Sequence, residues 1–412
     1  MKQIWIVYIF LGLVIGVKAQ EKSLAYFIEN GVENNPLLKD YRNQQRSNLI
    51  DSLRIIAGYK PQVNAVSNSN YAPTIGGWGY DGAITNGTNF SQLMTVSKRL
   101  VSKENLQNQL GAIQLLNESL INNGKITEQD LKKSIIAQYI TAYGDWLQLS
   151  YNKDMLAVFK KQQNVLKNLT EKTVYRQTDY LSFLVTMQQQ EFLISQLTVQ
   201  YQNDYASLNY LCALKDTIAV ALQKPTIDLA VIPEAESSIF YQQYKLDSLR
   251  LKNDGALIDF SYKPKMNLYG DGGYLSSFAP EAYKNFGISV GVNITVPIYD
   301  GKQKKMQHDK ISIAEQSRQD YRDYFKKQYN QQTAQLFQQL HATQQLIAQT
   351  NQQLSFSAAL IEANQKLIET GDAHMADYIL AINNYLTIKN NLTLNTITQL
   401  QLINQINYWS RK

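Results

Sequence analysis

Residues 286–298 alternate strictly between apolar side chains and small or polar ones. The apolar positions are Phe286, Ile288, Val290, Val292, Ile294, Val296 and Ile298. A period of two predicts a β-strand with one apolar and one polar face. A strand of about 13 residues rises roughly 43 Å, so at a tilt of about 45° it crosses roughly 30 Å, the thickness of a bilayer core. Because typical strands are about half as long, the alternation favours a membrane β-barrel over a soluble β-sandwich.

The first residues predict an export signal. A basic start at 1–3 precedes an apolar run over 4–17, and small residues follow that run. This arrangement is typical of a secretory signal peptide over 1–19, cleaved before Gln20, rather than of a membrane anchor. The remaining sequence has no apolar run near 18 residues, so we expect no transmembrane helix in it.

The composition gives no sign of catalysis. Cys212 is the single cysteine, so we expect no internal disulfide. The histidines His308, His341 and His374 lie too far apart in sequence to form a metal-ligand motif. The net charge of +6 is modest for 412 residues and, with the export signal, argues against a nucleic-acid partner. We find no nucleophile elbow, phosphate-binding loop or carboxylate cluster, and therefore expect neither an enzyme nor a cofactor.

Short segments of the first half return in the second half about 200 residues later, which favours an internal duplication. The pairs are 58–64 with 261–267, 51–54 with 247–250, and 94–97 with 294–297. Each repeat is expected to hold a helix that ends at a Lys-Pro step, then two strands, then a long helical hairpin. The expected bounds are 20–212 for the first repeat, 213–236 for a linking segment and 237–412 for the second repeat. In the first repeat we expect a helix over 22–57, strands over 62–71 and 88–97, and a helical hairpin over 100–212. In the second repeat we expect a helix over 237–258, strands over 265–275 and 285–298, and a helical hairpin over 302–409.

The hairpins begin with unusually long helices, because 100–173 and 302–370 contain no proline. Roughly 70 residues at 1.5 Å each give about 105 Å, far beyond a globular helix. Apolar residues recur every seven positions at Leu340, Ile347, Leu354, Ile361 and Ile368, which predicts a coiled-coil seam. The many Gln and Asn residues beside the seam fit either the wall of a water-filled space or an ordinary solvated surface.

Basic residues follow the second strand of each repeat. They are Lys98, Arg99 and Lys103 in the first repeat, and Lys302, Lys304 and Lys305 in the second. They fit either side chains that snorkel at a membrane boundary or an ordinary solvated helix start.

The strand count predicts an oligomer. An open sheet edge in lipid would leave backbone groups unpaired, so a membrane sheet must close. Four strands are too few, since the smallest barrels have about eight, whereas three chains would supply about twelve. The same three chains would set their long helices side by side in a second, helical cylinder.

In its element order the mature chain resembles the TolC-like outer-membrane efflux family. Two segments carry the resemblance further: 292–301, an apolar-Pro-apolar-aromatic-Asp-Gly stretch, and 136–146, which is similar to the family's Ala-Tyr-aromatic-Asp stretch. The resemblance implies a mainly α fold with a small β part, in which a homotrimer forms an α-helical barrel continuous with a 12-stranded outer-membrane β-barrel. The implied function is a passive exit duct of a tripartite efflux or type I secretion system. Its implied partners are outer-membrane lipid, a periplasmic adaptor (membrane fusion) protein and an inner-membrane transporter.

The resemblance also implies that the two hairpin tips project into the periplasm and form a gate, which adaptor contact opens. The family's tip pattern, Gly-x-x-polar-x-x-Asp, is met by Gly371, His374 and Asp377, and it aligns Arg176, Asp179 and Ser182 with the same positions in the first tip. Asp372 and Asp377 equally suit helix capping. The candidate gate and adaptor-contact residues are Arg176, Asp179, Ser182, Gly371, Asp372, His374 and Asp377, and the candidate lipid-facing residues are Phe286, Ile288, Val290, Val292, Ile294 and Val296.

The chief alternative is a periplasmic coiled-coil adaptor or structural protein without a membrane barrel. Such a protein would share the signal peptide and the long helices, but it would not need the apolar face of 286–298. An envelope enzyme is a further alternative, for which the sequence offers no site. Small molecules, metal ions and polypeptides all remain compatible as cargo.

Overall fold

The structure is a computed structural model that describes residues 22–81, 88–216, 218–277, 279–370, 372 and 374–411. The expected signal peptide at 1–19 and the candidate tip residue Gly371 lie outside the described residues. The chain divides into two compact units, each assembled from separate stretches of sequence. The helical unit comprises residues up to 36, 127–233 and 330–412, and the sheet unit comprises 37–126 and 234–329.

The sheet unit contains one antiparallel sheet in the order β1-β2-β3-β4. Its strands are β1 (Gln62–Tyr71), β2 (Thr88–Leu100), β3 (Lys265–Ser276) and β4 (Phe286–Thr295). A short 3-10 helix, η2 (Ala279–Lys284), connects β3 to β4. The central pair, β2 and β3, joins the two halves of the sequence, because Phe90 to Leu100 pair with Ser276 to Met266.

The last strand is shorter than the alternation predicts, since β4 ends at Thr295 and not at residue 298. Thr295 pairs with Lys265, the first residue of β3, so no partner strand continues beyond it. Pro264 precedes β3 and Pro297 follows β4, and neither residue has an N–H group to donate to a ladder. Ten residues in β4 therefore carry the pairing, and 296–298 continue the apolar pattern without it.

The first helix of the chain is in fact two helices. The sequence predicted one helix over 22–57, whereas the structure has α1 (Leu24–Asn34) and α2 (Pro36–Gly58). Asn35 is extended, with φ −64° and ψ 120°, because the ring of Pro36 disfavours the helical region for the residue before it. Proline is then well suited to the first position of the new helix, where no N–H donor is needed.

Two helices are exceptionally long. They are α4 (Lys103–Glu171) and α7 (Gln303–Thr370). α4 continues without a break through Asn122-Asn123-Gly124, where buried Asn122 donates a 3.1 Å hydrogen bond to the Ile239 carbonyl of α6 (Ile239–Ser261). Among the described residues, no helix is both long and apolar enough to cross a membrane.

The start of α7 explains why the motif at 292–301 ends with Asp300 and Gly301. Gly301 and Lys302 take positive φ angles of 64° and 68°, which turns the chain sharply after the sheet. The Asp300 carboxylate then accepts hydrogen bonds from the backbone N–H groups of Lys302 (2.8 Å) and Lys304 (2.7 Å). The aspartate therefore satisfies N–H donors that the first turn of a helix leaves free.

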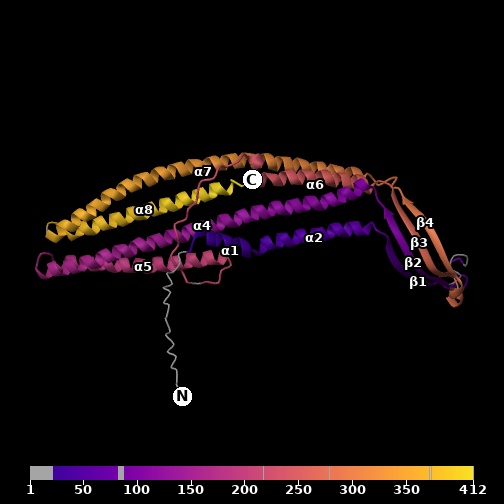
Figure 1. The fold of residues 1–412 in the computed structure, drawn as a ribbon, viewed down its shortest axis with the longest axis horizontal. Coiled ribbons are helices and arrows are strands. Elements are labelled where there is room, and N and C mark those ends of the chain that lie inside the picture. Colours follow the sequence, from indigo (N-terminus) through magenta and orange to yellow (C-terminus); the bar gives the residue numbers. More distant parts are fainter. Residues whose placement is uncertain are drawn as a thin grey trace, which may run out of the picture. The chain divides into compact units, whose positions relative to one another are not determined.

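In the helical unit, α5 (Gln177–Leu211) and α8 (Met375–Tyr408) run back from the ends of α4 and α7 (Figure 1). The predicted seam of α7 is confirmed, because Leu340 and Ile368 are buried and the residues between them at the same spacing are half-buried. The seam also contains a second row that the sequence analysis missed, formed by buried Thr343, Thr350 and Ser357. The glutamine pairs beside the seam, at 331–332, 338–339, 344–345 and 352–353, are exposed in the single chain.

The linking segment, whose position the sequence left open, lies against the core of the helical unit. Its Gln223 carbonyl is 2.7 Å from the hydroxyl of buried Tyr139 on α4. Lys22 forms a parallel bridge to Leu222 and a 2.8 Å ion pair with Asp216. The segment thus ties the chain before α1 to α4.

Candidate functional site

The sheet has an apolar face and a polar face, and the register of its strands shows that both faces continue from β4 onto the neighbouring strands. Val290 pairs with Gly270, which pairs with Val96 on β2, and Val96 in turn pairs with Val63 on β1. Cross-strand partners share a face of the sheet, so this row of the apolar face of β4 continues across all four strands. Ser67, Gln92 and Lys98 are polar positions on the same face. The candidate lipid-facing residues Phe286, Ile288, Val290, Val292, Ile294 and Val296 are between 52% and 86% exposed in the single chain.

The opposite face is polar and internally hydrogen-bonded. On β3, the Asp271 carboxylate accepts hydrogen bonds from the hydroxyls of Thr95 on β2 (2.6 Å) and Ser289 on β4 (3.4 Å). Tyr269 lies over Gly291, since a Cβ added at Gly291 would come within 2.4 Å of the tyrosine hydroxyl. The small residues of the alternation therefore make room for polar side chains from the neighbouring strand.

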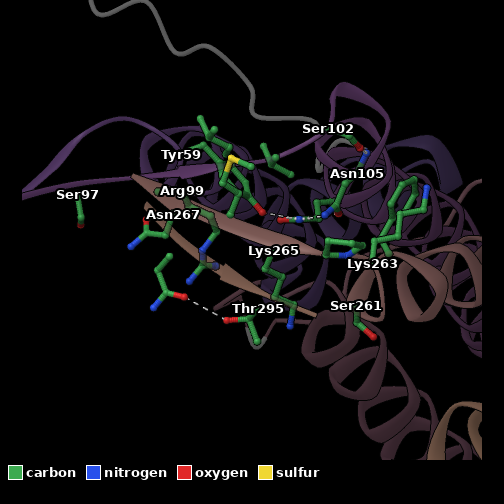
Figure 2. A pocket seen from close by; sticks show the side chains of 18 of the residues that line it. Tyr59, Ser97, Arg99, Ser102, Asn105, Ser261, Lys263, Lys265, Asn267 and Thr295 are labelled. Atoms are coloured by element: carbon green, nitrogen blue, oxygen red, sulfur yellow. Dashed lines mark hydrogen bonds between the residues drawn. The ribbon is translucent and has the colours of Figure 1, made fainter. Parts of the chain in front are cut away.

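A pocket of about 740 Å³ lies where the strands meet the helices of the sheet unit, and we call it the base pocket (Figure 2). Three cationic residues line it: Arg99, Lys263 and Lys265. Among the described residues that line it, none is acidic. The Gln109 amide donates to the Tyr59 hydroxyl (2.6 Å) and to the Asn105 side-chain oxygen (2.9 Å), which orders one wall.

The sequence did not reveal this pocket, because Arg99 was grouped with Lys98 as side chains either of a membrane boundary or of a solvated helix start. The register separates the two: Lys98 pairs with Leu268 on the apolar face, whereas Arg99 pairs with Asn267 on the polar face. Strand parity makes this distinction only because β2 extends to Leu100, three residues beyond the strand end predicted at 97. The approach of Lys265 to Arg99, however, depends on the pairing of β2 with β3.

The two returning helices start with closely similar geometry. Arg176 caps the start of α5 and His374 caps the start of α8, both in extended conformation. Asp179 and Asp377 are each the third residue of the following helix. The alignment made from the sequence, which set Ser182 against Asp377, is therefore wrong by three residues, and the first tip does keep its acidic residue.

The misalignment of the first tip arose because the family pattern begins with a glycine, and the first tip has none at the matching position. Thr173 has φ +59° and stands three residues before Arg176, the same spacing that Gly371 has before His374. The first tip thus makes its left-handed turn with threonine, which the family's glycine pattern could not reveal. Ser182 lies exposed one turn further into α5.

The tip carboxylates have different surroundings. The Asp179 carboxylate accepts a 3.2 Å hydrogen bond from the Arg176 backbone N–H, so it acts as a helix cap. The Asp377 carboxylate is exposed and makes no hydrogen bond with the residues that the structure describes. At Asp372 it is the backbone N–H that bonds, to the Leu367 carbonyl (2.8 Å) at the end of α7.

An aromatic and aliphatic cluster lies behind both tips and joins them. Its members are Met155, Phe159, Leu166, Phe183, Ile368, Met375, Tyr378 and Ile382. The Tyr175 hydroxyl donates a 3.2 Å hydrogen bond to the Ile368 carbonyl, which links the first tip to the second. Burial raises the pKa of Tyr175, and the nearby charges of Asp179 and Asp372 raise it further.

A buried carboxyl lies in the motif stretch 136–146 of α4. Asp145 is 4% exposed, and its Oδ1 accepts a 2.7 Å hydrogen bond from Gln200 on α5. Burial, followed by the neighbouring Asp204, raises the pKa of Asp145 to about 7. In the described part of the chain, no three His, Cys, Asp or Glu residues lie close enough together to hold a metal ion.

These elements define a class of structure: a four-stranded sheet joined to long helical hairpins, each element set occurring twice. Solved structures of the same class cover nearly the whole chain. VceC, an outer membrane protein from Vibrio cholerae, is 12% identical with a TM-score of 0.77, over 94% of this chain and 96% of its own. The Campylobacter jejuni outer membrane channel CmeC is 9% identical with a TM-score of 0.73, over 94% and 86% of the two chains.

The open state of the outer membrane channel MtrE from Neisseria gonorrhoeae has a TM-score of 0.73 at 12% identity, over 94% of this chain and 89% of its own. No protein-family model matches the sequence, and no curated protein does. At such low identity the likeness establishes the fold alone: this chain has the TolC-like fold that these outer membrane proteins share.

Proposed function

We propose that the protein is a passive exit duct of the outer membrane, working as a homotrimer in a tripartite efflux or type I secretion system. The observation that carries the proposal is the exposed apolar face of the sheet, which runs over all four strands. Burying such a face in lipid removes apolar surface from water, which a single soluble chain would leave exposed.

The sheet edges support a trimer. β1 and β4 end the sheet, so each has one side without a partner among the strands that the structure describes. Pairing β4 of one copy with β1 of the next in three copies gives about twelve strands and leaves no open edge. The polar face, with Asp271 and Tyr269, then lines the interior, and two structural repeats per chain, 20–212 and 237–412, supply the pseudo-symmetric wall.

The tips are the proposed periplasmic entrance. Asp179 and Asp377 occupy the same position of their helices, so a trimer presents two rings of three carboxylates. Like charges in a narrow ring repel one another and attract cations. Contact of an adaptor protein with the exposed residues Arg176, Asp372 and His374 opens this entrance, and an inner-membrane transporter supplies the energy.

The proposal is tested by fractionating cells that express the full chain and cross-linking the extracted outer membrane. We expect a trimer in the outer-membrane fraction. A soluble periplasmic species would overturn the proposal and favour the adaptor alternative. Cysteines at the exposed positions Ser182 and Asp372 then allow cross-linking to the adaptor, and a transporter is expected in the same complex.

A further inference from the structure

We propose that the base pocket binds a small multivalent oxyanion, such as a phosphate-bearing solute, through Arg99 and Lys265. This inference rests on the proposed function, because it assigns the polar face of the sheet to the interior of a channel. It adds to that function a site with a defined charge preference at the inner end of the sheet.

The two cations share one face of the sheet and one end of it. Arg99 pairs with Asn267, and Lys265 stands two residues earlier on β3, paired with Thr295. A diagonal relation of this kind places Cβ atoms about 7–8 Å apart, within reach for long side chains. Figure 2 shows Arg99, Lys265 and Asn267 around the same space.

Nothing in the surroundings described by the structure neutralises these charges. Neither Arg99 nor Lys265 forms an ion pair with a described residue. The acidic residue of the same sheet face is Asp271, four residues beyond Asn267 and thus about 13 Å along β3. Asp271 is already bonded to Thr95 and Ser289.

Lys263 contributes less positive charge to the proposed oxyanion site than Arg99 and Lys265 do. Its ammonium lies 4.1 Å from the ring centroid of Phe260. The pKa of the neighbouring Glu104 is lowered by hydrogen bonds from its own backbone and from Ser102, and then by the charge of Lys263. Part of the Lys263 charge is therefore balanced locally, which leaves Arg99 and Lys265 as the uncompensated pair.

The pocket also has the neutral donors that an oxyanion needs. The side-chain amides of Asn267 and Asn293 and the hydroxyls of Ser97 and Thr295 line it. An Arg guanidinium binds the oxygens of phosphate or carboxylate in pairs, and such charge-assisted hydrogen bonds are the strong ones. In a trimer the site occurs three times, and rings of Arg and Lys are the device by which pores select anions.

The test is single-channel recording of the purified full-length protein in planar bilayers, with inorganic pyrophosphate as the probe. We expect pyrophosphate to block the wild-type channel, and the double variant Arg99→Gln/Lys265→Gln to raise the apparent dissociation constant of the block about tenfold or more. The reversal potential in a KCl gradient is expected to move toward potassium selectivity. The matched control is Lys98→Gln, which removes the same charge from the neighbouring residue on the apolar face.

An unchanged block in the double variant, or an equal loss in Lys98→Gln, would overturn the site. Calorimetric titration of the solubilised protein with pyrophosphate separates this inference from the proposed function. If the wild type conducts but binds no pyrophosphate, the site is wrong and the duct stands. If the wild type forms no channel, the duct is wrong, and binding that is lost in the double variant still supports the oxyanion site. The single variants serve if the double variant does not fold.

Discussion

At the scale of single residues, the most consequential positions are those whose chemistry conflicts with their surroundings. Asp145 is a carboxyl buried between α4 and α5, with Asp204 close by. Its pKa of about 7 in the fold is well above the roughly 3.9 of an unfolded chain, so folding favours the protonated form. The stabilisation is complete below about pH 4 and is lost as the pH rises through about 7.

We therefore predict that Asp145→Asn removes most of the fall in melting temperature between pH 5 and pH 8. At pH 8 the variant should be more stable than wild type by on the order of 2 kcal/mol, and near pH 4 the two should coincide. Thermal unfolding followed by circular dichroism at a series of pH values measures this. Asp154→Asn, an exposed change on the same helix, should keep the wild-type profile. A wild-type profile for Asp145→Asn would contradict the assignment.

A glycine on the polar face of the sheet is a second position at which the surroundings restrict which side chain can be present. Gly273 has φ +156°, and a Cβ there would lie 2.1 Å from the Gln92 carbonyl oxygen of the neighbouring strand. We predict that Gly273→Ala destabilises the sheet by about 2 kcal/mol or more, because backbone must move. Its pairing partner offers the control: at Gly287 a Cβ would meet no atom within 4 Å, so Gly287→Ala should be nearly neutral. Heat stability of the extracted protein on gels distinguishes the two.

At the scale of elements, the two returning helices α5 and α8 begin with the same backbone geometry but carry different side chains there. Both returning helices begin with a capping residue followed by aspartate at the third position. In α5 that aspartate bonds to the Arg176 backbone, whereas in α8 the Asp377 carboxylate is exposed and bonds to no described residue. Of the two roles that suited the sequence, capping is made by Asp179, and gating stays a prediction for Asp377.

We predict that Asp377→Ala raises the leak conductance or weakens the cation preference of the channel, with little change in melting temperature. The substitution removes an exposed negative charge near the start of α8. Stability should change little, because the interaction of such a charge with the helix dipole is typically worth only about 0.3–1 kcal/mol. Asp179→Ala is the matched comparison and should lower stability by about 1 kcal/mol, because a capping bond is lost. Planar-bilayer recording with parallel thermal unfolding decides this. Unchanged single-channel behaviour in Asp377→Ala would leave only a dipole role.

At the scale of the whole molecule, the exposed apolar face of the sheet unit is the feature that a single chain cannot account for. It offers isoleucine and valine side chains on β4 with no described element against them. The proposed trimer resolves this by closing the sheet within lipid, so assembly and membrane insertion are one process for the β part.

We predict that Val290→Arg blocks assembly in the outer membrane, since a charged residue facing mid-bilayer costs about 2–4 kcal/mol. Ser289→Arg, one residue earlier on the opposite face, should assemble normally, because its guanidinium would lie beside the Asp271 carboxylate. Heat-stable trimer in the outer-membrane fraction, measured on gels, is the readout. Equal assembly of both variants would show that the face assignment is wrong.

The sequence by itself determined the features that depend on neighbours along the chain. Period-two alternation set the two faces of β4, and the lack of proline allowed the long helices α4 and α7. Proline also decided two local ends that the predicted bounds did not include: Pro36 divides the first helix in two, and Pro297 lies just beyond the shortened β4. These effects act through the backbone of adjacent residues, so a single stretch of sequence contains their cause.

The tertiary structure decided whatever depends on residues far apart in sequence. The approach of Arg99 to Lys265 follows from the pairing of β2 with β3, two strands about 170 residues apart. The equivalence of Asp179 and Asp377 follows from where each returning helix begins, which a left-handed Thr173 concealed. Pairing and packing join side chains through space, and no local pattern encodes which distant strand or helix will be the neighbour.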